Sequence, residues 1–520
     1  GSQLDDKHDE KCEIESSGEA PDLSARTPAA DLPMTSFARL IACVLVLVCV
    51  NLYVSGVRGL DNGVGRLPPM GWNSWNAFGI SPRLIEPIIE QTADLMVSLG
   101  LRDAGYRYLN IDDGWQGERD SDSRITVDAQ RFPSGFKHLA DYAHAKGLLF
   151  GLYSDAGTHT CGGKEGSLGY EDIDARTYAD WGVDYLKYDN CFNRFLPIRP
   201  RFEKMRDALN ATGRPIFYSL CEWGVDDVWE WGASVGNSWR VTDDLMDHWD
   251  SLAHNADDAS QLHQHAGPGS WNDWDMLQVG NGGLRWIEEQ AHFAMWCLSK
   301  SPLVIGTDLR KISPDALALL KNEELIAVHQ DPLGKAARLA WHKGPYRVFS
   351  APLADGSVAV VIWNRHTHFN AYFYDDGSQC NYTTATFPIP KKLMNHTEYF
   401  KPPPDHHPHT RRRRRLQDER GDTSVPPDDT NGWDPPCKDN PRGNTVQVRL
   451  AWFAADMNLD TVKGVRVRDM LLKQDMGTRM GDSFPIDVRN HGARALRLTP
   501  VYDGNHQQQQ QQQADIVHYA

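Results

Sequence analysis

Hydrophobic and polar positions follow two alternating patterns between residues 67 and 334. Short, mainly hydrophobic runs predict buried strands, and stretches with a 3.6-residue period, such as 88–99, 136–146 and 286–298, predict amphipathic helices. The predicted strands are 71–75, 106–113, 148–155, 185–189, 216–222, 238–244, 270–277 and 303–308. Eight strands alternating with helices predict an α/β fold with a (β/α)8 barrel over residues 60–334, and a doubly wound parallel sheet is the alternative.

The pattern changes after residue 334. Short strand-like runs at 338–342, 346–353, 357–364, 444–453, 464–472 and 495–500 predict a C-terminal antiparallel β-sandwich over residues 335–505. Residues 402–442 are rich in Pro, His and Arg and predict a disordered insertion, and the poly-Gln tail 506–520 is low in complexity. The basic run 411–415 could contact nucleic acid, but the net charge of -16 argues against such a partner and favours a solvated or protease-sensitive loop.

The N-terminal residues fall into two segments of different composition. Residues 1–33 are polar and mixed in charge, which predicts a disordered extension. Met34 precedes the apolar run 40–50, which is short for a membrane span and predicts a signal peptide over residues 34–59. A secreted, lysosomal or vacuolar protein is therefore expected. A membrane-anchored protein with a lumenal or extracellular catalytic domain is the alternative, and no stable membrane partner is expected unless that anchor is retained.

The stretch 185–191 places a lysine and an aspartate on one face of a strand. Lys187 and Asp189 share that face because strand side chains repeat every two residues. A neighbouring lysine favours the ionised carboxylate, which at a strand end can act as a nucleophile. For an isolated pair of this kind a structural ion pair is the more common interpretation. The recurrence of the pattern along the chain favours chemistry.

Nearly every predicted barrel strand ends in carboxylates or aromatic residues. In a barrel these ends meet at one face, where barrel enzymes build their active sites. Carboxylates and Arg hydrogen-bond sugar hydroxyls, aromatic rings pack on sugar rings, and two carboxylates suffice to hydrolyse a glycosidic bond. The sequence has no zinc-type His motif, EF-hand loop or phosphate-binding loop near these ends, so no metal and no cofactor are expected, although two acids could hold Mg²⁺.

Six motifs, in chain order, resemble glycoside hydrolase family 27, the α-galactosidases (melibiases) and α-N-acetylgalactosaminidases. They are PPMGWNSW at 68–75, NIDDGW at 110–115, GLYSDAG at 151–157, KYDNC at 187–191, CEWG at 221–224 and GPGSWNDWDM at 267–276. The resemblance implies a retaining hydrolase that removes terminal α-galactose from oligosaccharides, polysaccharides or glycoconjugates. It covers residues 67–334 and continues weakly to 500.

The resemblance also implies roles for individual residues. Asp189 matches the nucleophile and Asp244 the acid/base, and the spacing from Arg240 favours Asp244 over its neighbour Asp243. Residues matching the family's substrate contacts are Trp75, Asp112, Asp113, Tyr153, Lys187, Glu222, Trp223, Arg240, Asp275 and Met276. The resemblance implies a Cys161–Cys191 disulfide. A retaining mechanism needs carboxyls about 5–5.5 Å apart, and an acid with a raised pKa when the site is dry.

The resemblance implies the choice of substrate at residues 221–223, where a Glu and a bulky neighbour fill the space beside the sugar's 2-position and the N-acetylgalactosaminidases carry smaller residues. A buried carboxylate at Glu222 accepting a bond from the sugar 2-hydroxyl would oppose an acetamide there, so galactose is favoured. An α-N-acetylgalactosaminidase and an inactive sugar-binding barrel are the alternatives, and a metal-dependent lyase on the same barrel is a further one. Trp274 stands where the family often has Pro, and we expect it to alter the rim of the site.

Six of the nine cysteines follow the predicted signal peptide: Cys161, Cys191, Cys221, Cys297, Cys380 and Cys437. With Cys161 and Cys191 paired by the resemblance, Cys221 and Cys297 lie in apolar runs typical of buried thiols. Cys380 and Cys437 flank the insertion, so we predict that they form a disulfide; two free thiols are the alternative. The glycosylation sequons are at Asn210, Asn381 and Asn395.

Overall fold

The computed structural model describes residues 60–366 and 444–502. The predicted N-terminal extension, signal peptide, insertion and poly-Gln tail lie outside the described residues. So do Cys380, Cys437, Asn381 and Asn395, and the predictions made for them stay predictions.

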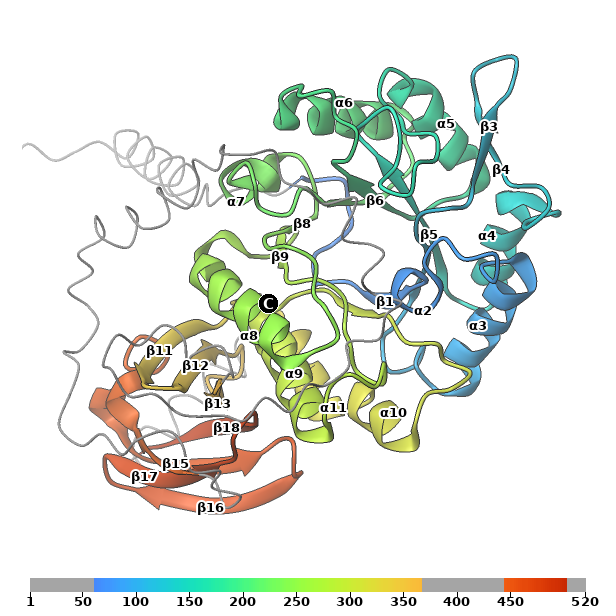
Figure 1. The fold of residues 1–520 in the computed structure, drawn as a ribbon. Coiled ribbons are helices and arrows are strands. Elements are labelled where there is room, and N and C mark those ends of the chain that lie inside the picture. The colour runs from blue at the N-terminus through green and yellow to red at the C-terminus, as the bar shows by residue number, and fades with distance from the viewer. Residues whose placement is uncertain (1–59, 367–443, 503–520) are drawn as a thin grey trace, which may run out of the picture. The chain divides into compact units, whose positions relative to one another are not determined.

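Eight parallel strands form a closed ring in the first part of the chain (Figure 1). Along the sheet they are β10 (Leu303–Ile305), β1 (Met70–Asn73), β2 (Tyr108–Ile111), β5 (Leu149–Asp155), β6 (Tyr185–Asp189), β7 (Phe217–Leu220), β8 (Ser238–Arg240) and β9 (Trp271–Asp273). The ring closes where Leu277, just beyond β9, bridges Ile305 of β10 in parallel. The predicted (β/α)8 barrel is confirmed, and the doubly wound alternative is wrong because the strands from β1 to β9 follow one another in chain order and the ring then closes at β10.

Amphipathic helices cover the outside of this barrel. In α3 (Glu86–Ser98), Ile89, Ala93 and Met96 repeat at helical spacing and are fully buried. The other helices are α2 (Trp75–Phe78), α4 (Gly135–Ala145), α5 (Glu171–Trp181), α6 (Ile198–Ala211), α7 (Val228–Trp231), α8 (Trp249–Ala259), α9 (Trp286–Ser299), α10 (Pro314–Leu320) and α11 (Glu323–His329). The sequence pattern therefore locates the three predicted helices to within about two residues, the usual uncertainty of helix ends.

Several barrel strands are shorter than the sequence predicts at the ends that carry the polar residues. β7 ends at Leu220 rather than at Glu222, and β9 ends at Asp273 rather than at Leu277. The backbone turns away just beyond these ends, where Trp223 and Asp275 take left-handed conformations with φ of 61° and 80°. Polar residues there satisfy loop amides instead of a strand ladder, so hydrophobic pattern alone extends the strands too far.

The C-terminal part forms antiparallel sheets, as predicted. The larger sheet has the order β11 (Arg338–Lys343), β12 (Tyr346–Pro352), β13 (Val358–Asn364), β18 (Ala493–Tyr502), β15 (Val462–Asp469) and β16 (Gln474–Met480). The smaller pairs β14 (Asn444–Arg449) with β17 (Ser483–Val488). Alternate residues such as Val360, Ile362, Val446 and Val448 are buried in their common core.

Four strands escaped the sequence analysis. β16 is largely exposed and therefore lacks hydrophobic alternation. β17 does alternate, with Phe484, Ile486 and Val488 buried, but Pro485 argues against a strand away from an edge. The hairpin of β3 (Gln116–Arg119) and β4 (Ile125–Val127) is too short to show a period.

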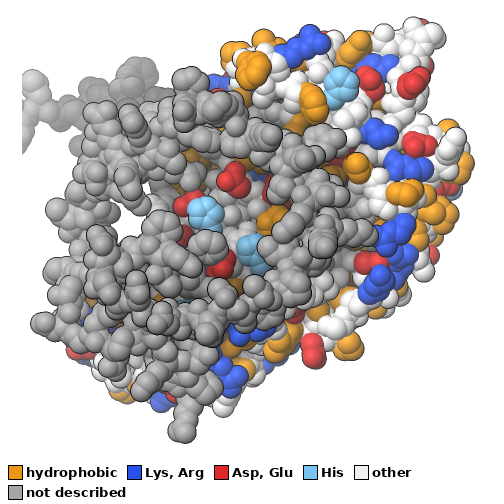
Figure 2. Space-filling model, viewed as in Figure 1, with side chains coloured by type: hydrophobic (Ala, Val, Ile, Leu, Met, Phe, Trp, Pro, Cys, Tyr) orange, Lys and Arg blue, Asp and Glu red, His pale blue; other side chains and the backbone are white. Residues whose placement is uncertain are grey.

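Helix α9 joins the two parts of the fold, because it contacts both β13 and β18. The barrel core continues past it to Trp363, Met470 and Ala495 of the C-terminal part. On the described part of the face shown in Figure 2, acidic, basic and hydrophobic side chains are interspersed, so the net charge of -16 is not gathered there into one patch. Within the described residues, none of the helices has the length and apolar character needed to cross a bilayer.

Candidate active site

The C-terminal end of β6 holds the predicted nucleophile. Tyr185, Leu186 and Tyr188 are buried in the barrel wall, and Asp189 follows them with only 6 % of its surface exposed. The Tyr153 hydroxyl donates to Asp189 Oδ2 at 3.0 Å, and the Asn190 amide donates to Oδ1 at 3.0 Å. Burial raises the pKa of Asp189 to about 6, against the opposing effect of Lys187.

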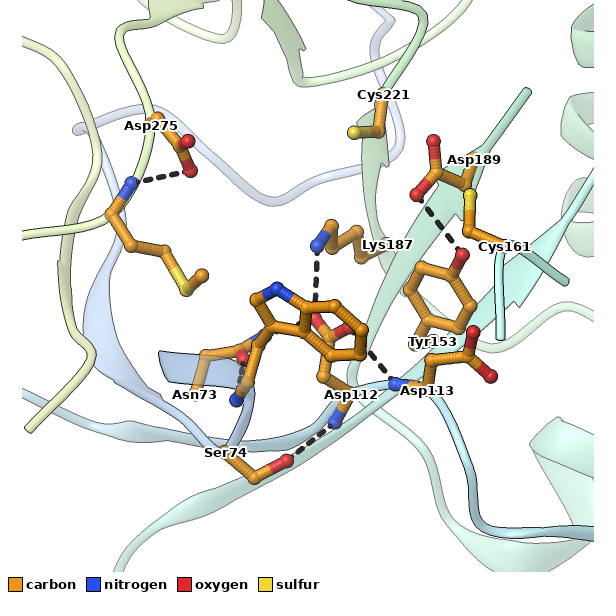
Figure 3. Close-up of polar contacts among 12 residues, drawn as sticks. Asn73, Ser74, Asp112, Asp113, Tyr153, Cys161, Lys187, Asp189, Cys221 and Asp275 are labelled. Carbon is orange, nitrogen blue, oxygen red and sulfur yellow. Dashed lines mark hydrogen bonds and ion pairs between the residues drawn. The ribbon is translucent and has the colours of Figure 1, made fainter. Parts of the chain in front are cut away.

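Lys187 forms its direct ion pair with Asp112 and not with Asp189. Its Nζ lies 2.9 Å from Asp112 Oδ2, and 5.2 Å from the centre of the Tyr153 ring. Asn73 Nδ2 donates to the same oxygen at 2.8 Å. Figure 3 shows Lys187 directed at Asp112 while Tyr153 is directed at Asp189. Burial disfavours the charged lysine, but the nearby carboxylates, Asp112 first, outweigh it and raise the pKa of Lys187.

Asp113 lies beside this pair and is 1 % exposed. Its Oδ2 accepts a hydrogen bond from the Gly162 amide at 2.6 Å, whereas its buried Oδ1 has no hydrogen-bond partner within the described part of the chain. Burial raises the pKa of Asp113 to about 6.

A disulfide fastens the loop after β5 to the loop after β6. Cys161 and Cys191 are bonded, with their Cα atoms 5.2 Å apart, so the implied pairing is confirmed. Asp155 lies under this bridge and accepts from the amides of Gly157 and Cys191. Burial raises the pKa of Asp155, and the neighbouring Asp189 adds to that effect. The disulfide and Asp155 thus fix the backbone on which the nucleophile sits.

The same four side chains form one group of possible metal ligands: Asp155, Asp189, Cys161 and Cys191. The two sulfurs are joined to each other and offer no thiolate. Asp155 accepts backbone amides through both of its oxygens. The donor set therefore does not fit a metal ion.

Arg240 lies at the end of β8 and is 3 % exposed. Its Nη2 lies 3.0 Å from Asp244 Oδ1 and 3.2 Å from Asp275 Oδ2. The Asp244 side chain is 60 % exposed, and the charge of Asp244 adds to the raised pKa of Asp189. Burial would raise the pKa of Asp244, but Arg240 and then Lys187 outweigh it and lower the pKa. The raised pKa expected for Asp244 refers to a dry site and stays a prediction; in the open site Arg240 stabilises the carboxylate.

Asp275 is held from three sides. Its Oδ2 accepts from the Leu245 amide at 2.7 Å, and its Oδ1 accepts from the Met276 amide at 2.7 Å. Its own amide donates to Asp273 at 2.8 Å, and its carbonyl accepts from the Trp296 indole at 2.7 Å. These contacts stabilise the left-handed backbone at Asp275, which a residue other than glycine adopts only at a cost of about 1 kcal/mol or more.

A cavity borders some of these residues, although Asp189 and Asp244 are not among those that line it. Its lining includes Lys187, Arg240, Asp275, Met276 and the thiol-bearing Cys221, and the remaining lining residues are Asn73, Asn110, Tyr185, Ser219, Asp273 and Val304. In Figure 3, Lys187, Cys221, Asp189 and Asp275 surround one space. Trp75 follows β1 and is half-buried, with its amide bonded to Asn73 Oδ1 at 2.8 Å. The structure thus gathers carboxylates, two cations and an indole at one end of the barrel.

Comparison with known proteins gives the site its context. Residues 67–331 match the family described as Alpha galactosidase A (Melibiase_2). The Alpha-galactosidase 3 of Arabidopsis thaliana is 52% identical over 324 residues, or 61% of this chain and 73% of that protein. The α-galactosidase of Cyamopsis tetragonoloba is 49% identical over 307 residues, covering 59% of this chain and 74% of that protein. The chain belongs to this α-galactosidase family.

Solved structures agree with that assignment. The crystal structure of α-galactosidase I from Mortierella vinacea superimposes with a TM-score of 0.68 at 32% identity, over 85% of this chain and 99% of that one. The α-galactosidase from Saccharomyces cerevisiae with raffinose gives a TM-score of 0.66 at 28% identity, over 85% of this chain and 99% of that one. The family likeness therefore includes the C-terminal sheets as well as the barrel.

Glu222 is fixed by backbone amides of the loop that follows β7. It is fully buried, and its two oxygens accept from the amides of Gly224 at 2.7 Å and Asp226 at 2.9 Å. Burial raises the pKa of Glu222 to about 8. The interpretation that Glu222 accepts a bond from the sugar 2-hydroxyl stays a prediction, because each of its oxygens can accept a second hydrogen bond. Glu222 shapes the loop that carries the half-buried Trp223.

Cys221 is the residue that the sequence analysis missed. It lines the cavity, and Arg240 Nη1 lies 3.8 Å from its Sγ. Strand alternation carried the signal, because Cys221 is two positions after Ser219, which also lines the cavity. Trp274 differs from expectation as well: it is 2 % exposed and packs edge-on against Trp296 in the core, so it does not form the rim.

Proposed function

We propose that this member of the α-galactosidase family is a retaining enzyme that releases terminal α-galactose, with Asp189 as nucleophile and Asp244 as acid/base. The observation that carries the proposal is the contrast between the two carboxylates. Asp189 is buried and oriented by Tyr153, whereas Asp244 is exposed and pairs with Arg240. Two carboxylates in unlike environments are the arrangement that double displacement needs.

Asp189 attacks the anomeric carbon of the galactoside. The Tyr153 hydroxyl donates to Oδ2 and the Asn190 amide to Oδ1, so the carboxylate is fixed in one orientation before the substrate arrives. Asp244 donates its proton to the departing oxygen, the bond from the anomeric carbon to that oxygen breaks, and a galactosyl ester forms on Asp189. Asp244 then removes a proton from water, which attacks the anomeric carbon and releases galactose and the Asp189 carboxylate.

The remaining polar side chains bind the hydroxyls of the sugar. Asp112 and Lys187 form a buried pair at the base of the site, and Asp113 offers an unpaired oxygen beside them. On the other side, Arg240 and Asp275 form a second buried pair. Charged partners of this kind make strong, directional bonds to hydroxyl groups. Trp75 and Met276 supply the apolar surface against which the ring packs.

Galactose is preferred over N-acetylgalactosamine in this proposal, because residues 221–223 fill the space expected beside the sugar's 2-position. Cys221 lies in the cavity wall and Trp223 follows it in a left-handed turn. The loop they form is braced from beneath by the buried Glu222. A bulky indole and a thiol there leave little room for an acetamide, whereas a hydroxyl fits.

A substrate panel and azide rescue test the proposal together. We expect p-nitrophenyl α-galactoside to be hydrolysed well and its N-acetylgalactosaminide poorly. With azide, Asp189→Gly should form the β-galactosyl azide, because azide attacks from the face that Asp189 occupied. Asp244→Gly should form the α-galactosyl azide by capture of the ester on Asp189. The opposite pair of anomers would reverse the two roles, and unchanged turnover in either variant would remove that residue from the mechanism.

We also propose that the protein passes through the secretory pathway. The Cys161–Cys191 disulfide is typical of oxidising compartments, and Asn210 of the sequon is exposed at the end of α6. Expression in a eukaryotic host should give a mass that falls on endoglycosidase treatment, and Asn210→Gln should remove one glycan. A protein that stays with washed membranes would favour the anchored alternative.

A further inference from the structure

Helix α8 begins just after Asp244 and lies against both the acid loop and the C-terminal sheet. The acid loop is defined here as residues 241–248, between β8 and α8. In Figure 1, α8 lies beside α9, near β12 and β13. A helix in this position can transmit the position of the sheet to the acid, and its contacts on both sides show how.

On the barrel side, the backbone on each side of Asp244 is fixed. Asn255 of α8 is 2 % exposed, and its Nδ2 donates to the Asp243 carbonyl at 2.9 Å. The Leu245 amide donates to Asp275 Oδ2 at 2.7 Å, and the Leu245 carbonyl accepts from Gln278 Nε2 at 2.7 Å. Asp244 itself points into solvent and bonds only through Arg240 among the contacts within the described residues. Its placement therefore depends on the backbone that its neighbours hold.

On the other side, α8 is tied to the C-terminal sheet at both of its ends. Near its start, Trp249 is 5 % exposed, stacks on His491 at 5.0 Å with an interplanar angle of 8°, and donates through Nε1 to the His366 carbonyl at 2.9 Å. Near its end, Asp257 forms an ion pair with Arg365, which follows β13. Rotation or translation of α8 would break contacts at both ends, so the sheet fixes the helix.

We infer that the C-terminal sheet positions the general acid through α8, with Asn255 and Trp249 as positioning residues. This inference rests on the proposed function, because it takes Asp244 to be the acid. A proton donor must lie within hydrogen-bond reach of the leaving oxygen. A displacement of about 1 Å caused by a change remote from the chemistry can lower the rate about a hundredfold. The sheet therefore acts on proton donation while making no contact with the sugar.

Kinetics with two leaving groups test the inference. Asn255→Ala removes the bond to the Asp243 carbonyl. We expect kcat/KM for methyl α-galactoside, whose leaving group needs a proton, to fall about tenfold or more. For 2,4-dinitrophenyl α-galactoside, which needs almost none, we expect a change of less than about twofold. Trp249→Phe keeps the stacked ring but loses the bond to the His366 carbonyl. It should shift the ratio of kcat/KM for the two galactosides in the same direction by a smaller factor.

The matched control breaks another contact between the barrel and the sheet. Glu324 of α11 pairs with Arg468 of β15 at 2.6 Å, and α11 does not adjoin the acid loop in the chain. Glu324→Gln should lower thermal stability without changing the ratio of the two substrates. If Asn255→Ala does not yield folded protein, the isosteric Asn255→Asp, which presents an acceptor to the Asp243 carbonyl, replaces it.

Equal losses for both substrates in the Asn255 variant, or the same ratio as in Glu324→Gln, would overturn the inference. Asp244→Ala measured in parallel separates this failure from that of the proposed function. If Asp244→Ala is selective for the poor leaving group and the Asn255 variant is not, the inference alone is wrong. If Asp244→Ala shows no selectivity, both are wrong. The basic limb of the kcat/KM profile gives a second readout, since the charge of Asp244 adds to the raised pKa of Asp189 and a displaced Asp244 changes that contribution.

Discussion

At the scale of single residues, the site works through unequal environments for similar side chains. Asp189, Asp112 and Asp244 are all aspartates at strand ends, yet one is held by a tyrosine, one by a lysine and one by an arginine. Burial raises the pKa of Asp189 to about 6, whereas Arg240 helps to lower that of Asp244. In the free site these shifts place the proton on Asp189, so the proposed roles require it to move to Asp244 when the sugar binds.

Removal of the acid should affect substrates according to their leaving groups. We predict that Asp244→Ala lowers kcat/KM for methyl α-galactoside by about 10²–10⁴, the usual contribution of general acid catalysis. The 2,4-dinitrophenyl galactoside should lose far less, because its leaving group departs without a proton. Asp243→Ala is the control: that side chain is exposed next to Asp244 and should be nearly silent. A large loss in Asp243→Ala instead would move the acid by one residue.

The same pKa shifts predict an acidic optimum. Asp189 and Asp244 influence each other, so the pair titrates as a unit and is active with one shared proton. That proton is lost as the pH rises through about 6, the raised pKa of Asp189. We therefore expect kcat/KM to fall above about pH 6. On the acid side we expect kcat/KM to stay high until the pH drops below the ordinary pKa range of aspartate. A basic limb near pH 8 would contradict this assignment.

At the scale of elements, backbone geometry just past the strand ends presents the functional groups. Asp275 is the clearest case, because its left-handed backbone follows β9 and its carbonyl is bonded to Trp296 of α9. Helix α9 packs between the barrel strands and the C-terminal sheet, so its position is fixed independently of the sugar. A helix on the outer layer thus controls a loop residue at the site.

Two tryptophans allow this control to be measured. Trp296→Phe removes the indole bond to the Asp275 carbonyl, and Trp271→Phe removes an equal bond of 2.7 Å to the Gly65 carbonyl, ahead of β1. Each should cost about 1–3 kcal/mol of stability, because a buried carbonyl loses its partner. Only Trp296→Phe should raise KM for galactosides severalfold. Equal kinetics in the two variants would show that Trp296 has only a structural role.

At the scale of the whole molecule, buried carboxylates at the site reduce stability at neutral pH. Burial raises the pKa of Asp189, Asp113 and Asp273 to about 6 in each case. A carboxyl whose pKa is higher in the folded than in the unfolded state stabilises the fold most below its unfolded value, and that contribution is lost as the pH rises through the folded value. Ionisation of these carboxyls, which the site needs, therefore lowers the stability of the fold.

Asp273→Asn should make this cost visible without removing a predicted sugar contact. It keeps an oxygen to accept the Asp275 amide while removing the charge. The difference between 3.8 and about 6 corresponds to about 3 kcal/mol at most. We expect the thermal midpoint of the wild-type protein to fall more steeply between about pH 4 and about pH 6 than that of the variant. The exposed Asp103→Asn, 68% accessible, is the control, and parallel curves for both variants would contradict the prediction.

The sequence by itself determined the barrel, the family and the aspartates proposed for catalysis. Burial against a core imposes a period of two or 3.6 residues on the hydrophobic positions, so the period can be recognised without coordinates. The motifs at strand ends can be recognised in the same way, because they follow one another in chain order. The long strand predictions failed at their polar ends for the same reason: hydrophobicity does not report where a backbone stops pairing. The exposed β16 left no signal because it buries too little to need one.

Only the tertiary structure decided which groups meet. Lys187 and Asp189 are near in sequence, yet the lysine pairs with Asp112 from another strand. Glu222 turns to backbone amides and leaves the cavity wall to Cys221, a choice made by a loop after β7. The link from His366 and His491 through α8 to Asp244 joins residues far apart in the chain. Such contacts depend on where elements pack in space, and a linear pattern encodes which elements form but not which side chains they bring together.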